Sequence, residues 1–284
     1  MNLFFSTEPA SCPYLAARQE RRLVTALEGP DPERLHDRLL RAGFRRSQGY
    51  AYRPACTGCA ACVPVRIPVA RFALRRTWRR ILRDNRDLIP SERPGVATQE
   101  QYALFRRYLE GRHAESGMAD MTWAEFRAMI NDSPIASRVV EWRRTSDRSL
   151  IAASLTDRCP SGLSGVYKFF DPDERRRSLG TLIILWHVQR ALELGLPHVY
   201  LGYWIANSPK MGYKARFQPL ERLTLAGWQP MPAEAPAAVP LLAPTPDATT
   251  AGEAPESDPG CGAAGAGTEG FSQGARARTL RPTQ

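Results

Sequence analysis

Apolar and polar positions follow two different periods along this chain, and together they predict both strands and helices. Apolar or β-branched runs bounded by turn residues are typical of strands, and they cover residues 22–27, 50–54, 63–69, 139–142, 150–156, 165–170 and 198–204. Apolar residues three to four positions apart predict helices over residues 31–43, 77–88, 98–111, 122–130 and 178–194. The second half runs strand, strand, strand, helix, strand, so we expect an α/β fold with a crossover helix near its end.

Composition divides the chain into three segments. Residues 1–95 contain a cysteine-rich loop, and residues 96–230 contain the strand meander with its crossover helix. From residue 231 to residue 284 the sequence is dominated by Pro, Ala, Gly and Thr and has no helical or strand period. Such a segment cannot bury enough apolar surface to offset its ordering entropy, so we expect a disordered tail.

The composition is that of a globular chain, with 43% hydrophobic and 24% charged residues among 284. No run of about 18 apolar residues could cross a bilayer, and the first residues lack the basic flank and apolar core of a signal peptide. We therefore expect a cytoplasmic protein without a membrane partner. The chain has neither a Gly-x-Ser-x-Gly elbow nor a Walker loop, so covalent hydrolases and NTPases have no support.

The net charge is strongly positive, at +10, and only three of the 39 basic residues are Lys. The predicted helix 77–88 carries Arg79, Arg80, Arg83 and Arg86 at spacings that place several of them on one face. A solvated helix face would interleave acidic residues. The excess of arginine therefore favours contact with a phosphate backbone over an ordinary solvated surface.

Four cysteines form the most distinctive motif. Cys56, Cys59 and Cys62 lie within seven residues of one loop, and Cys12 is a distant fourth. Thiols stay reduced in the cytoplasm, so the group could hold zinc in a four-sulfur site or an iron–sulfur cluster. The alternative is a turn of small residues in which the cysteines pack as modest hydrophobes.

The start of the last predicted helix resembles the pyrophosphate loop of acyl-CoA N-acyltransferases. Arg175, Ser178 and Gly180 match its spacing, with Ser178 in place of the first glycine. A helix N-terminus offers free amides and a positive dipole end to an anion. An ordinary helix start would account for the same residues. However, the segment lies between a predicted strand and the crossover helix, and this position favours anion binding.

Several motifs together resemble one family, the bacterial aspartate/glutamate leucyltransferases, relatives of eukaryotic arginyl-tRNA–protein transferases. The resemblance covers residues 1 to about 230. It rests on the cysteine run with its Tyr52-Arg53-Pro54 lead and Pro64-Val65-Arg66-Ile67 exit, Arg79-Arg80 with Asn85-x-Asp87-Leu88, Val166 to Pro172, Ser178-Leu179-Gly180, Tyr200 to Ile205, and Lys210-Met211-x-Tyr213-Lys214.

The resemblance implies transfer of leucine from leucyl-tRNA to the N-terminal amine of proteins that begin with Asp or Glu, which marks them for N-degron proteolysis. It implies a mixed sheet flanked by helices like that of acyl-CoA N-acyltransferases (a GNAT-like fold, α/β or α+β), with a smaller, cysteine-containing GNAT-like part at the N-terminus. The implied partners are aminoacyl-tRNA and the acceptor protein, without DNA, and transfer needs no cofactor. Arginyl-tRNA as the donor, an acetyl-CoA-dependent N-acetyltransferase and a non-catalytic zinc-ribbon RNA binder remain the alternatives.

On this interpretation the reaction lies between the strand ending at Asp171 and the strand 200–204. Tyr167 and Asp171 alternate along one strand, so they share a face. The alternative interpretation is that Asp171 is only a turn residue before Pro172. We expect Asp171 or water to accept the amine proton, Tyr167 and Tyr203 to donate hydrogen bonds, and Asn207 to orient. The candidate cations for the acceptor's acidic side chain are Arg53, Arg66, Lys210 and Lys214.

Overall fold

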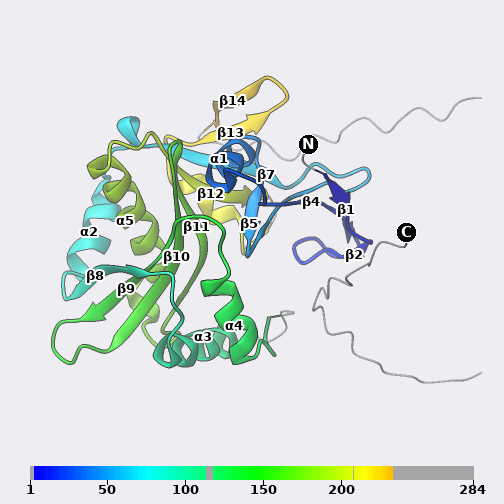
Figure 1. The fold of residues 1–284 in the computed structure, drawn as a ribbon. Coiled ribbons are helices and arrows are strands. Elements are labelled where there is room, and N and C mark those ends of the chain that lie inside the picture. The colour runs from blue at the N-terminus through cyan, green and yellow to red at the C-terminus, as the bar shows by residue number, and fades with distance from the viewer. Residues whose placement is uncertain (1–2, 113–117, 207, 233–284) are drawn as a thin grey trace, which may run out of the picture. The chain divides into compact units, whose positions relative to one another are not determined.

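The computed structural model describes residues 3–112, 118–206 and 208–232. Asn207 and all of the predicted tail except Met231 and Pro232 therefore lie outside the described residues, and Met231 is buried in the core. The predicted mixed sheet flanked by helices is confirmed (Figure 1). Eight strands form the large sheet, in the order β14-β13-β7-β12-β11-β10-β9-β8. Their bounds are β7 Val63–Pro68, β8 Leu88–Pro94, β9 Ser137–Arg144, β10 Leu150–Cys159, β11 Gly162–Phe170, β12 His198–Trp204, β13 Glu221–Thr224 and β14 Gly227–Pro230.

A smaller sheet belongs to the N-terminal part. It has the order β1-β4-β6-β5, and β2 pairs with β3 beside it. The bounds are β1 Phe5–Ser6, β2 Ala10–Ser11, β3 Gln19–Glu20, β4 Arg22–Ala26, β5 Arg45–Ser47 and β6 Tyr50–Pro54. The division near residue 95 stays a prediction, and the large sheet takes β7 and β8 from before that point and the other strands from after it.

Helices cover both faces of the large sheet. Their bounds are α1 Pro32–Arg41, α2 Arg76–Asp84, α3 Gln99–Arg112, α4 Trp123–Asn131 and α5 Leu179–Glu193, with 3₁₀ turns η1 Val69–Arg71, η2 Arg175–Arg177 and η3 Gly212–Arg216. Phe105 of α3 packs edge-on against Tyr167 and Phe169 of β11. The alternate residue Lys168 bonds to Gly180 of α5. Because successive strand residues point to opposite faces, α3 and α5 lie on opposite faces.

Local signals account for most helix boundaries. Asp31 caps α1 by accepting from the Arg34 amide at 2.9 Å, and Thr122 forms a capping box with Glu125 at α4. The predicted helix 77–88 is too long. It ends at Asp84, where the Asn85 side chain bonds to the Ile81 carbonyl at 2.8 Å, and Leu88 begins β8.

The core of the protein fills the two spaces between sheet and helices. Its largest fully buried side chains include Trp142, Phe105, Phe126 and Phe169.

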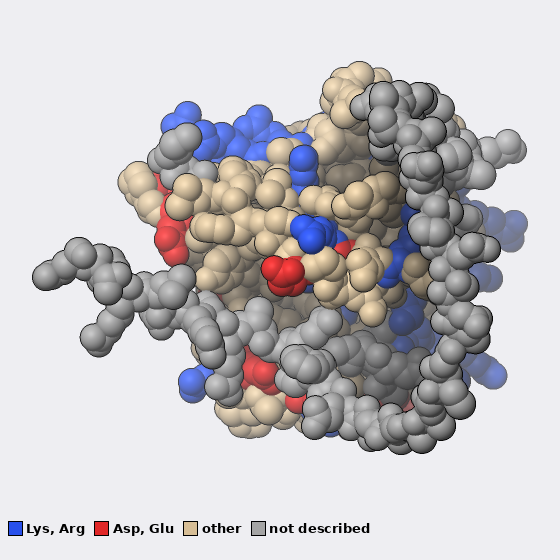
Figure 2. All heavy atoms as spheres, turned by 90° about the vertical axis from the view of Figure 1, so that its right-hand side faces the viewer, with Lys and Arg blue, Asp and Glu red and all other residues tan. Residues whose placement is uncertain are grey.

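In the described part of the chain no helix is both long and apolar enough to span a membrane. Figure 2 shows Lys and Arg side chains gathered along the border of one face, with smaller patches of Asp and Glu.

Candidate functional site

Two neighbouring strands of the large sheet separate part-way along their length. β11 and β12 run parallel and pair at Leu163 with Val199 and at Ser164 with Tyr200. Beyond these pairs β11 continues to Phe170 beside β10, and β12 continues to Trp204 beside β7. The register of β12 shifts between Tyr200 and Gly202. We call the region beyond the last pair, between Gly165–Phe170 and Leu201–Trp204, the strand split.

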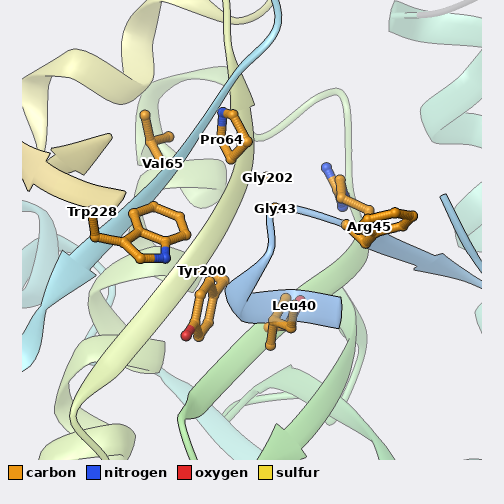
Figure 3. A pocket seen from close by; sticks show the side chains of 10 residues that line it. Leu40, Gly43, Arg45, Pro64, Val65, Tyr200, Gly202 and Trp228 are labelled. Carbon is orange, nitrogen blue, oxygen red and sulfur yellow. The ribbon is translucent and has the colours of Figure 1, made fainter. Parts of the chain in front are cut away.

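Arg45 occupies the edge of β11 that β12 leaves. Its guanidinium donates to the carbonyls of Gly165 at 3.2 Å and Val166 at 2.8 Å. These bonds replace the ladder that a neighbouring strand would supply. Gly202, at φ +73°, lets the arginine pass, because a Cβ there would lie 2.3 Å from an Arg45 terminal nitrogen. A cavity of about 10 Å³ lies where Arg45 passes Gly202 (Figure 3). Its lining includes Arg45, Tyr200 and Trp228. The cavity has room for about one water.

Lys214 occupies the other edge of the split. Its ammonium donates to the carbonyl of Tyr203 on β12 and lies 3.2 Å from the Met211 sulfur. The residue is 4% exposed. Burial lowers the pKa of Lys214 well below its ordinary value, and the nearby charges of Arg45 and Lys168 lower it further. This enclosure gives no support to the predicted role of Lys214 as a cation for the acceptor's acidic side chain.

Lys168 was missed by sequence reasoning, and it lies on β11 within the split. Its ammonium is 3.1 Å from the Tyr213 hydroxyl and 3.3 Å from the Gly180 carbonyl, and it lies 5.3 Å from the Tyr213 ring centre. The side chain is half-buried. A signal was available: a charged residue in an apolar and aromatic strand, and one of only three lysines in the chain.

The three predicted catalytic residues that the structure describes, Tyr167, Asp171 and Tyr203, do not converge. Tyr167 is half-buried against Phe105 on the α3 side, and burial raises the pKa of Tyr167. Asp171 follows β11, and its Oδ1 accepts from Arg107 at 2.8 Å and from the Asp173 amide at 3.0 Å. Among the described residues Asp171 Oδ2 has no hydrogen-bond partner.

Tyr203 has a packing position rather than an open one. It is 3% exposed, and its hydroxyl lies 3.1 Å from each of the carbonyls of Gly43 and Tyr52. Burial raises the pKa of Tyr203. A hydroxyl with one proton to donate is already occupied here, so Tyr203 joins β12 to the N-terminal part, and its predicted role as a donor to substrate has no support from this geometry.

Two of the other predicted cations have local partners. Arg66 pairs with Glu221 at 2.8 Å and lies over the Trp228 ring at 4.3 Å. Arg53 is exposed and lies over the Phe44 ring at 5.3 Å. Lys210 is exposed in the segment between β12 and η3. Arg66 and Arg53 therefore have local contacts, and Lys210 is open to solvent.

The predicted arginine face of α2 does form. Trp78 and Ile81 are buried, while the charged side chains turn outward. The exposed arginines are Arg75, Arg76, Arg79, Arg80, Arg83 and Arg86. The Asn85 amide bonds to the Arg177 carbonyl at 2.9 Å, which places the exposed Arg175 of η2 beside the end of α2. We call these seven residues the arginine face.

The predicted pyrophosphate loop begins α5 with an unusual backbone. Ser178 adopts the left-handed region at φ +56° and makes no capping bond with its side chain. Non-glycine residues rarely adopt this conformation. The Gly180 carbonyl faces Lys168. The predicted phosphate-binding role of Ser178 and Gly180 stays a prediction.

The four cysteines gather in the N-terminal part without forming a metal site. The pKa of Cys62 is raised to about 12, by burial first and then by the neighbouring Cys12, Cys56 and Cys59. Cys56 exchanges weak hydrogen bonds with the Arg21 backbone. In the part of the chain that the structure describes, no three His, Cys, Asp or Glu side chains are arranged to hold a metal ion. The predicted zinc or iron–sulfur site on these four cysteines therefore stays a prediction.

Known proteins match nearly the whole described chain. Residues 10–80 match the family model for the N terminus of arginine-tRNA-protein transferase, and residues 100–224 match the model for its C terminus. An aspartate/glutamate leucyltransferase from Parvibaculum lavamentivorans is 54% identical over 81% of this chain and 95% of its own length. This chain belongs to the aspartate/glutamate leucyltransferase family.

Two further aspartate/glutamate leucyltransferases have nearly the same sequence identity to this chain. The Gluconacetobacter diazotrophicus relative is 53% identical over 81% of this chain and 88% of its own length. The Ruegeria pomeroyi relative is 54% identical over 80% of this chain and 84% of its own length. Among solved structures, L-PGS from Bacillus licheniformis matches with 10% identity and a TM-score of 0.41, over 51% of this chain and 46% of that chain.

Proposed function

We propose that this protein moves leucine from leucyl-tRNA to the N-terminal amine of proteins beginning with Asp or Glu. The names of its relatives support this proposal. The observation that carries its location is the strand split, where β11 and β12 stop pairing at Ser164 and Tyr200. A sheet edge that opens between two parallel strands is a typical place for a substrate in an α/β fold.

The reaction needs little from the enzyme beyond alignment. The acceptor's α-amine, with a pKa near 7.7–8.0, is partly neutral at pH 7. Its nitrogen attacks the ester carbonyl carbon of leucine, and the bond from that carbon to the ribose 3′ oxygen breaks. The amine loses a proton and the leaving oxygen gains one. Positioning the two substrates supplies most of the rate enhancement.

Asp171 or water is the proton acceptor in this proposal. Asp171 lies where β11 ends, and Arg107 and the Asp173 amide fix its Oδ1. Its Oδ2 faces no hydrogen-bond partner among the described residues, so that oxygen can receive a proton. Tyr167, packed against Phe105, supports the strand. Asn207 remains a proposed orienting group outside the described residues.

The arginine face is the proposed path of the tRNA. It carries seven exposed positive side chains on α2, on the residues that flank α2 and on η2. Among the described residues its one ion pair joins Arg83 to the neighbouring Asp84. Phosphate contacts of this kind supply affinity without reading sequence. We expect the affinity for leucyl-tRNA to fall steeply with salt, and removal of Arg79, Arg80 and Arg83 together to reduce that slope by about three.

An acetyl-CoA-dependent reaction is not favoured. A carrier that added hydrogen bonds to the open edge of β11 would compete with Arg45 for the carbonyls of Gly165 and Val166. Arginyl-tRNA as donor is likewise not favoured, because the relatives are named leucyltransferases. The four cysteines are proposed as a packing feature of the N-terminal part, and no step of the reaction runs through them.

One assay tests the proposal. The full-length protein is supplied with leucyl-tRNA, arginyl-tRNA or acetyl-CoA, each labelled in the transferred group, and with a peptide that begins with Asp. We expect label on the peptide from leucyl-tRNA alone. Label from either of the other donors in place of leucine, or RNA binding without transfer, contradicts the proposal.

A further inference from the structure

We propose that Lys168, held by Tyr213, is the anion-binding group that receives the acidic side chain of the acceptor protein's first residue. This inference rests on the proposed function. It assigns to the strand split a carboxylate subsite on the α5 side of the sheet, between β11, η3 and the start of α5. With the acceptor there, water takes the amine proton, because Asp171 is held by Arg107 of α3 on the opposite face.

The geometry leaves Lys168 able to bind a further group. An ammonium has three donors. Two of them are directed at the Tyr213 hydroxyl and the Gly180 carbonyl, at 3.1 and 3.3 Å. Both partners are neutral, so the third donor and the whole charge remain for a ligand. Because the side chain is half-buried, an ion pair formed there is screened less than one on the surface.

The strand split contains basic groups without acidic ones. Arg45 bonds to two carbonyls, Lys214 to one carbonyl and a thioether, and Lys168 to a carbonyl and a hydroxyl. Among the described residues no carboxylate forms an ion pair with any of the three. Elsewhere on the same chain arginines pair repeatedly with Asp and Glu. A site of one sign without counter-charges attracts an anion.

The chemistry of lysine suits a carboxylate at two distances. Asp and Glu differ by one methylene, so their carboxylates lie at different depths from the same α-amine. A lysine ammonium is a compact charge on a flexible stem, whereas the planar arginine fork demands a fixed geometry. Lys168 can therefore follow either side chain. The choice of Lys at this position is notable in a chain whose other basic residues are almost all Arg.

The alternative candidates are less suitable. Arg66 is already paired with Glu221, and Lys214 is enclosed at 4% exposure. A phosphate of the tRNA is the competing ligand for Lys168. The observations favour the carboxylate, because phosphate contacts use exposed clusters such as the arginine face, whereas Lys168 is a single recessed ammonium with one free donor.

The test compares charged and neutral acceptors. Transfer to peptides beginning with Asp, Asn, Glu or Gln is measured at saturating leucyl-tRNA, for the wild type, Lys168→Gln and Lys168→Arg. We expect Lys168→Gln to lower kcat/KM for the Asp and Glu peptides about 10- to 100-fold, the value of a charged hydrogen bond. The Asn and Gln peptides should change little, so that the preference for acidic residues collapses. Lys168→Arg should keep part of it.

Matched variants separate the possible outcomes. Arg127→Gln removes an exposed charge from α4, and it should leave all four rates unchanged. An unchanged Asp-to-Asn ratio in Lys168→Gln overturns the inference, as does loss of that ratio in Lys210→Gln instead. A raised KM for leucyl-tRNA with an unchanged ratio assigns Lys168 to the RNA and also overturns it. If the wild type transfers leucine to none of the four peptides, the proposed function itself fails.

Discussion

Arg45 and Arg46 are neighbours on β5, yet they enter two groups with opposite electrostatics. Arg46 forms a bidentate pair with Asp157, at 2.7 and 2.8 Å, and both side chains are fully buried. Ser137 donates to the same carboxylate at 2.7 Å. Arg45 reaches into the strand split, where it bonds to carbonyls alone. We call the first group, around Asp157, the closed cluster.

The difference separates a structural role from a binding role. In the closed cluster every charge has a partner of opposite sign, so nothing remains for a ligand and the cluster fastens β5 to the large sheet. In the strand split the basic groups are held by neutral atoms and their charge is uncompensated. Burying charge without compensation costs stability, and such sites are where binding or catalysis is found.

Removing the acid of the closed cluster should have the largest effect on stability. Asp157→Ala leaves the Arg46 guanidinium buried without a counter-charge, which costs about 3–5 kcal/mol. Chemical denaturation measures the loss of unfolding free energy. Asp147→Ala, at a side chain 51% exposed, is the control and should cost no more than about 1 kcal/mol. Equal losses of unfolding free energy in the two variants would show that the buried Arg46–Asp157 pair stabilises the fold no more than an exposed ion pair.

The second-largest effect is expected at Gly202, beside which the Arg45 side chain reaches β11. In Gly202→Ala the new Cβ meets the Arg45 guanidinium, so the arginine must leave the β11 carbonyls. We expect a loss of about 2–3 kcal/mol together with loss of leucine transfer. Gly195→Ala has a similar positive φ of +66° with nothing within 4 Å of its Cβ. Gly195→Ala therefore measures backbone strain alone, which we expect to cost about 1 kcal/mol. If both variants lost the same unfolding free energy, contact with Arg45 would not account for the effect of Gly202→Ala.

Lys214 should make stability depend on alkaline pH. Burial lowers the pKa of Lys214 in the folded state, so between that pKa and about 10.4 the unfolded chain binds more protons than the folded one. Unfolding free energy contributed by this group therefore rises with pH across that window and is constant above it. Denaturation at pH 7, 8.5 and 10 should show a smaller rise in Lys214→Met than in the wild type. Identical slopes would contradict an uncompensated, buried Lys214.

The smallest effect is expected at the cysteines. Because the pKa of Cys62 is raised to about 12, little thiolate is present at pH 8, and only the thiolate is alkylated. Mass spectrometry after brief iodoacetamide treatment should find Cys62 labelled more slowly than in unfolded protein, and transfer should survive in Cys59→Ala. Protection of all four cysteines that a chelator abolishes would instead reveal a bound metal.

Local sequence predicted the helices and central strands well, and edge strands poorly. The crossover helix and β12 were predicted almost to the residue. β8 was missed because Leu88 continues the spacing of the preceding helix and Pro90 and Pro94 argue against a strand. As an edge strand of the large sheet, β8 has a free side where proline is tolerated. β13 and β14 are short and have no clear alternation.

Sequence alone therefore determined the family, the mixed α/β class, the positive charge and the outward arginines of α2, because these depend on residue identity and spacing along the chain. Tertiary structure decided which side chains meet at the strand split. Arg45 bonds to a carbonyl 121 residues away, and Lys168 meets a tyrosine 45 residues away. It also enclosed Tyr203 and Lys214, which residue type alone had suggested as functional groups. The physical reason is that burial and counter-charges, which set the chemistry of an ionisable group, come from non-local packing.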